Sequence, residues 1–101
     1  MSAVITIHFP VDDVPEAIAA LQRNAGLLEE ISESTKSRGI RSHRFFAGDG
    51  ELLVVDEWET AEQFQEFFDG NAQVAQAVES LGVTGPPVVS IFRPIDAPGT
   101  I

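Results

Sequence analysis

A short turn between two β-rich segments constrains this chain more than any other feature of its sequence. Asp49-Gly50 is a dipeptide typical of two-residue hairpin turns. Segments rich in β-branched and aromatic residues flank it at Ile40–Ala47 and Glu51–Trp58. The sequence therefore predicts a β-hairpin in which each residue of the first strand has a defined partner in the second.

The register of this hairpin predicts which side chains share a face. Side chains alternate along a strand, and directly paired residues point to the same side of the sheet. One face then carries three cross-strand pairs: Arg41 with Trp58, His43 with Asp56, and Phe45 with Val54. A slip of one residue would change every pair, so the prediction depends on the turn.

The N-terminal part of the chain predicts a strand followed by helix. Ala3–Phe9 alternates in the manner of a strand and stops at Pro10. Asp13 is a suitable N-cap for a helix whose apolar residues recur at helical spacing as far as Ile31. Gly26 lies inside this helical region, and we expect a kink or a division there because glycine disfavours helix.

In the second half of the chain, after the hairpin, the sequence predicts helix followed by a strand. Thr60-Ala61-Glu62-Gln63 is a candidate capping box and predicts the start of a helix, whose three phenylalanines are expected to belong to the core. Ala72–Leu81 predicts another short helix, and Val88–Arg93 predicts the last strand. Residues 94–101 form a tail without a regular pattern.

The order β-α-β-β-α-β is that of an α+β, ferredoxin-like fold with a four-stranded antiparallel sheet and helices on one face. A length of 101 residues predicts one domain, 1–101, that includes the tail. Both faces of the sheet carry apolar side chains, and a monomer seldom exposes a large apolar patch. We therefore expect a homodimer in which a second copy covers the open face.

Charge and composition exclude several functions. The net charge of −10 disfavours nucleic acid and anionic membrane surfaces as partners. The chain contains no cysteine, and its two histidines do not have the spacing of a metal site. The N-terminus has no basic region before its apolar residues, and no stretch is apolar for the ~20 residues that span a bilayer. We expect a cytoplasmic protein without a bound metal.

The segment Leu52–Phe68, LLVVDEWETAEQFQEFF, resembles the dimeric α/β-barrel proteins grouped with the antibiotic biosynthesis monooxygenases. The shared features are an apolar strand that ends in acid-x-Trp and a Thr-initiated helix of acidic and aromatic residues. The order of elements is similar as far as about Arg93. The resemblance implies a homodimer whose sheets face each other and enclose a mostly apolar cavity in each subunit.

Some members of that family oxidise phenolic or quinol-type molecules with molecular oxygen and without metal or flavin. The resemblance therefore implies a cofactor-independent oxygenase that takes a small hydrophobic aromatic ligand, with Trp58 lining the cavity. Haem-degrading relatives carry a histidine on the helix after the motif. This chain has phenylalanines there and no tyrosine anywhere, which argues against haem degradation.

The candidate residues each have a catalytic and a structural interpretation. His43 or His8 would be the proton acceptor, and Asp56 would orient it; either histidine could instead be part of a structural polar pair. Trp58 would stack on the ligand or simply pack in the core, and Arg41 would stabilise an oxyanion or lie in solvent. The other candidates for ligand contact are Thr6, Phe45 and Val54.

Three functions remain open at this point. The first is the oxygenase. The second is a non-catalytic dimeric barrel that binds a small ligand or takes part in a stress response. The third is an isomerase or decarboxylase that uses a histidine without oxygen. Loss of turnover in a His43→Ala or His8→Ala variant would separate an enzyme from a non-catalytic protein.

Overall fold

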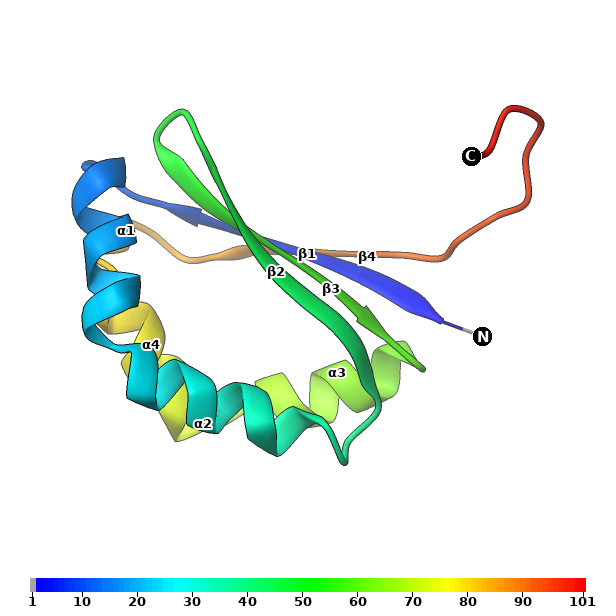
Figure 1. Ribbon diagram of the computed structural model, residues 1–101, viewed down its shortest axis with the longest axis horizontal. Coiled ribbons are helices and arrows are strands. Elements are labelled where there is room, and N and C mark those ends of the chain that lie inside the picture. The colour runs from blue at the N-terminus through cyan, green and yellow to red at the C-terminus, as the bar shows by residue number, and fades with distance from the viewer. Residues whose placement is uncertain (1) are drawn as a thin grey trace.

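The computed structural model describes residues 2–101, in which four strands form one antiparallel sheet with helices on one side (Figure 1). The sheet order is β2-β3-β1-β4, which confirms the predicted ferredoxin-like α+β fold. The strands are β1 Ala3–Pro10, β2 Ile40–Gly48, β3 Glu51–Trp58 and β4 Val88–Phe92. The helices are α1 Val14–Arg23, α2 Ala25–Thr35, α3 Ala61–Phe68 and α4 Ala72–Ser80.

The β2–β3 hairpin has the predicted turn. Gly48 pairs with Glu51 across Asp49-Gly50, and Gly50 adopts a φ of 67°, which a residue without Cβ tolerates. His43 is paired with Asp56 and Phe45 with Val54, so the predicted register is confirmed from Ser42 to the turn.

The predicted pairing of Arg41 with Trp58 is wrong. A β-bulge interrupts the ladder between Ile40 and Ser42, and Ile40 takes the position opposite Trp58. Strict alternation would have turned the Arg41 guanidinium toward the core and Ile40 away from it. The extra residue in the bulge reverses this, so that Ile40 packs against the core and Arg41 is exposed.

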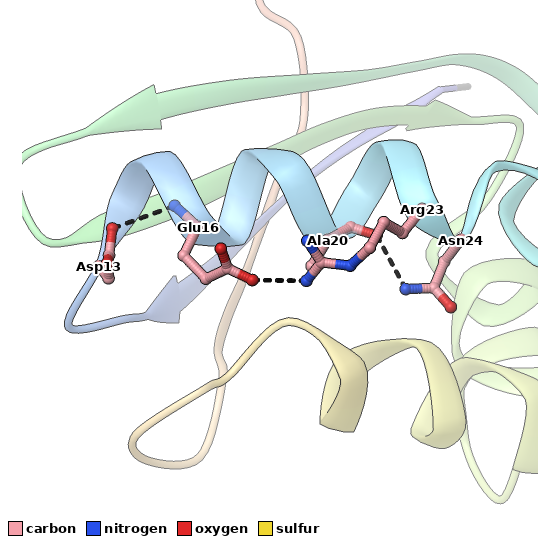
Figure 2. A network of polar contacts seen from close by, with 5 residues as sticks. All are labelled: Asp13, Glu16, Ala20, Arg23 and Asn24. Atoms are coloured by element: carbon pink, nitrogen blue, oxygen red, sulfur yellow. Dashed lines mark hydrogen bonds and ion pairs between the residues drawn. The ribbon is translucent and has the colours of Figure 1, made fainter.

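Helix α1 begins at the predicted N-cap. The Asp13 carboxylate accepts a hydrogen bond from the Glu16 backbone N–H at 3.0 Å (Figure 2). The Glu16 side chain does not return to the cap but pairs with Arg23 at 2.5 Å, two turns along the helix. At α3, Thr60 and Gln63 form the complete reciprocal capping box that the sequence predicts.

The helical region divides at Asn24, two residues before the position expected from Gly26. The Asn24 backbone leaves helical geometry, and its side-chain amide donates to the Ala20 carbonyl at 2.8 Å (Figure 2). A short amide side chain that bonds to nearby backbone competes with helix continuation. Gly26 lies within the first turn of α2 instead.

The core lies between the sheet and the helices. Alternate residues of β1 and β3 are buried against the helix layer, and Trp58 and Ile5 have no exposed surface. The core residues of the sheet are Ala3, Ile5, Ile7, Phe9, Leu52, Val54 and Trp58, and those of the helices include Ala17, Ala20, Phe64, Phe67 and Leu81.

The opposite face of the sheet has no helical cover (Figure 1). Phe46, Val88 and Phe92 lie on this open face, and Val88 and Phe92 are 59% and 56% exposed. Beyond β4 the chain extends away from the helices (Figure 1). None of the helices within residues 2–101 is both long enough and apolar enough to cross a membrane.

Candidate functional site

A cavity of about 90 Å³ lies between the sheet and the helix layer of a single chain. Strands β1, β2 and β3 form its floor, and helices α2, α3 and α4 form its roof. Most of its lining is apolar. The lining residues are Ile7, Phe9, Leu28, Ile31, Ser32, Thr35, Ile40, His43, Phe45, Val54, Asp56, Trp58, Phe64, Phe67, Phe68, Val74, Ala77, Val78 and Leu81.

A hydrogen-bonded group of three side chains forms the polar part of this cavity. Asp56 is buried, with 5% of its surface exposed, and its two carboxylate oxygens have different partners. His43 Nδ1 lies 2.6 Å from Oδ1, and Trp58 Nε1 donates to Oδ2 at 3.1 Å. Both oxygens of this buried carboxylate are thereby satisfied within the protein.

This arrangement fixes the orientation of the His43 imidazole. The Asp56 carboxylate accepts hydrogen bonds, so Nδ1 is the nitrogen that carries the proton toward it. In the neutral ring Nε2 is then the acceptor, and no side chain among residues 2–101 is hydrogen-bonded to it. The His43 side chain is 33% exposed, compared with 7% for Asp56. The ring therefore presents an unpaired acceptor nitrogen where a ligand can reach it.

An aromatic wall adjoins this polar group. The Trp58 ring centroid is 5.6 Å from that of Phe67 and 5.9 Å from that of Phe64, and Phe64 stacks on Phe68 at 5.2 Å. Beside them, the His43 ring contacts the ring of Phe45 edge-on at 4.9 Å. The predicted core phenylalanines of α3 are buried or partly buried, and they line the cavity as well. Such a wall suits a flat aromatic ligand.

Helix α2 contributes two hydroxyl groups that the sequence analysis did not single out. Ser32 and Thr35 both line the cavity, and the buried Thr35 hydroxyl donates to the Ser32 carbonyl at 2.6 Å. A signal for Thr35 was available, because it follows Leu28 and Ile31 at helical spacing on the same apolar stripe.

Three predicted site residues lie elsewhere. Arg41 is not part of the cavity lining, because the bulge leaves it outside the ladder. Thr6 and His8 are on the open face of the sheet, where His8 Nδ1 lies 2.5 Å from Glu51. The structure thus brings together His43, Asp56, Trp58, Phe45 and Val54 and separates them from Thr6, His8 and Arg41.

The cavity also differs in position from the one that the resemblance implied. That cavity was expected between two facing sheets, whereas this one lies on the helix side of one sheet. The reason is the burial pattern of β3, which directs Val54, Asp56 and Trp58 toward the helices. In residues 2–101, no three histidine, aspartate or glutamate side chains come together as a possible metal site.

The fold is that of small α+β, ferredoxin-like proteins, and solved structures with this fold are similar to the chain along nearly its whole length. No protein-family model and no curated protein sequence matches it. A monooxygenase from the gene ActVA-Orf6 of Streptomyces coelicolor, solved in complex with nanaomycin D, has a TM-score of 0.72 at 22% identity and covers 95% of this chain and 89% of its own.

Two other solved structures are similar over almost all of both chains. Rv0793 from Mycobacterium tuberculosis has a TM-score of 0.64 at 22% identity and covers 98% of this chain and 100% of its own. SnoaB from Streptomyces nogalater, described as a cofactor-independent oxygenase, has a TM-score of 0.62 at 14% identity with 98% of each chain covered. Antibiotic biosynthesis monooxygenases are thus among the structures that share this fold, as the resemblance implied.

Proposed function

We propose that this protein is a cofactor-independent oxygenase of the antibiotic biosynthesis monooxygenase type, acting on a small phenol or quinol in the cavity. The observation that carries the proposal is the Asp56-oriented His43, which presents Nε2 at an apolar, aromatic-walled cavity. The similarity in fold to SnoaB and to the ActVA-Orf6 monooxygenase supports it. The proposal requires neither a metal nor a flavin.

His43 is the proton acceptor in the proposed reaction. Nε2 takes the proton of the ligand hydroxyl, and Asp56 stabilises the imidazolium that results. The electron-rich anion then gives electrons to molecular oxygen. One oxygen atom becomes a new carbonyl on the ring and the other leaves as water. The ring supplies all the electrons that oxygen takes up, so the reaction needs no further reductant.

The counter-ion of the phenolate is His43 itself. No arginine or lysine is among the lining residues within the described part of the chain, so Arg41 does not take the oxyanion role considered from sequence. Proton transfer leaves an imidazolium next to the new anion. In an apolar cavity the attraction between these two charges is stronger than in water. The same residue therefore removes the proton and stabilises the product of its removal.

The experiment uses the single tryptophan of a chain without tyrosine. Phenols and quinols are titrated while Trp58 emission and oxygen uptake are recorded together. We expect saturable quenching with oxygen uptake in the natural protein. In His43→Ala we expect binding to persist and oxygen uptake to be lost. Ser42→Ala is the control, because the neighbouring side chain points to the open face.

Other outcomes identify the alternatives. Quenching without oxygen uptake would favour a ligand-binding barrel or an enzyme that works without oxygen, and conversion of the ligand under argon would separate these two. Oxygen uptake that persists in His43→Ala but disappears in His8→Ala would refute the assignment of the base.

We further propose that the active form is a homodimer in which a second copy covers the open sheet face. The support is the exposure of Val88 and Phe92 on that face, since large exposed apolar patches mark association sites. Phe92→Asp should shift sedimentation to the monomer. Ile95→Asp, which adds the same charge in the tail beyond β4, should leave the dimer intact. A natural protein that sediments as a monomer would refute this arrangement.

A further inference from the structure

The cavity opens to solvent along β2, which is an edge strand of the sheet. Its lining there includes His43 and Phe45, and both side chains are partly exposed. A ring can therefore reach His43 Nε2 from this side without displacing a helix. Helix α2 lines the same cavity from the helix layer, so a bound ring would contact residues of both β2 and α2.

One face of α2 forms its part of the cavity wall. The residues that α2 contributes follow helical spacing: Leu28, Ile31, Ser32 and Thr35. Ser32 lies in the middle of this face and is half-buried. Its short side chain is therefore part of the cavity wall and not of the exposed side of the helix.

The Ser32 hydroxyl differs from the other hydroxyls within the helices. Those of Ser34, Thr35 and Ser80 each donate to the carbonyl three residues earlier at 2.6 Å. Ser32 Oγ makes no such bond and is not hydrogen-bonded to any other group in residues 2–101. A serine within a helix ordinarily bonds back to the backbone or points into water. At a cavity wall, an unpaired hydroxyl can instead bond to a molecule that occupies the cavity.

The other polar groups of the lining already have partners. Both Asp56 oxygens accept hydrogen bonds, and the Trp58 N–H donates to one of them. The Thr35 hydroxyl donates its single proton to the Ser32 carbonyl. Two groups are left, namely His43 Nε2, which accepts, and Ser32 Oγ, which both donates and accepts. A ligand therefore meets two separate polar points, one on the sheet and one on the helix layer.

We infer that Ser32 is a ligand-binding residue that recognises a second oxygen substituent on the ring whose first hydroxyl faces His43. Ser32 Oγ donates to a carbonyl oxygen or accepts from a hydroxyl at that position. The inference rests on the proposed function for the phenolic nature of the ligand. It narrows the ligand class from phenols in general to rings with two oxygen substituents, and it makes Ser32 a determinant of specificity.

Three pairs of small molecules test the role of Ser32. Each pair is one isomer of dihydroxybenzene and the methylphenol that has its methyl group in the same position. The two members are similar in size and differ in the second oxygen. Their dissociation constants are measured from Trp58 emission under argon, so that binding is observed without reaction with oxygen.

Ser32→Ala removes the hydroxyl and should leave the fold intact, because alanine is the strongest helix former. For at least one pair we expect it to weaken binding of the dihydroxybenzene about three- to tenfold, the value of one hydrogen bond, and to change binding of the methylphenol by less than about twofold. Ser34→Ala is the matched control on the same helix. Its side chain is exposed and lies outside the cavity, so neither compound should be affected.

The outcomes separate this inference from the proposed function. If Ser32→Ala changed both members of every pair alike, the role of Ser32 would be overturned while the phenol site remained. A selective loss for a dihydroxybenzene that the natural protein does not oxidise in air would support the role of Ser32 and count against the oxygenase. Failure of all six compounds to bind the natural protein would overturn both.

Discussion

Replacing Asp56 with alanine should destabilise the protein by about 2–4 kcal/mol, whereas asparagine should cost only about 1 kcal/mol. The difference comes from the two hydrogen bonds that the carboxylate accepts, one from Trp58 and one from His43. Asp56 is therefore part of both the candidate site and the buried core. Stability and activity should therefore respond differently to the two substitutions.

The alanine value follows from the burial of the two donors. Trp58 has no exposed surface, so its indole N–H would be left buried and unpaired, at a cost of about 1–3 kcal/mol. The His43 side chain is 33% exposed, so water can replace the lost carboxylate there, and the loss is that of one ordinary bond, about 0.5–1.5 kcal/mol.

Asparagine keeps the first bond and reverses the second. Its amide oxygen can accept from Trp58, and its NH₂ group then faces His43 Nδ1. The imidazole must accept there, so its proton moves to Nε2, the nitrogen that faces the ligand. We expect Asp56→Asn to fold nearly as well as the natural protein and to lose oxygen uptake.

The measurement is urea unfolding followed by Trp58 emission at one fixed protein concentration, because association would make the midpoint depend on concentration. Glu57→Ala is the control, since this side chain points to the open face. If Asp56→Ala lost no more stability than Glu57→Ala, the buried hydrogen bonds would not stabilise the fold. If Asp56→Asn kept full oxygen uptake, the tautomer argument would fail.

Three further predictions concern helix capping and backbone geometry. Thr60→Ala removes the capping box of α3 and should cost about 1 kcal/mol in urea unfolding; an equal loss in Thr100→Ala, in the exposed tail, would show that the effect is not due to the cap. Gly26→Ala should stabilise α2 by about 0.5–1 kcal/mol, because a Cβ there meets nothing within 4 Å. Gly50→Ala should destabilise by about 1–2 kcal/mol, because its φ of 67° is unfavourable for alanine. If the urea midpoints of Gly26→Ala and Gly50→Ala shifted in the same direction, this reasoning would be contradicted.

Local rules were sufficient to predict most of the fold and the centre of the candidate site. The Asp49-Gly50 turn fixed the register, and the register placed His43 opposite Asp56. Alternation then placed Trp58 on the same face as both. Each step depends only on neighbours along one hairpin, which is why the sequence alone allowed it.

The features that the sequence did not predict depend on packing between helices and strands. The bulge at Arg41 resolves a conflict between strict alternation and burial of Ile40, and only the assembled core makes that conflict visible. Which face of the hairpin is buried depends on the helices that pack against it. His8 was therefore a reasonable candidate from sequence, although β1 turns it to the side opposite His43.

Strand β4 has a consequence for how molecules of this protein behave toward one another. It forms an edge of the sheet, none of its five residues is charged, and four of them are exposed apolar side chains. An uncharged apolar edge is a template for strand pairing with another molecule. The net charge of −10 keeps molecules apart at low ionic strength. At 0.1 M salt this repulsion is largely screened beyond about 10 Å. Colloidal stability should therefore fall as salt is added, with β4 as the surface along which chains first associate.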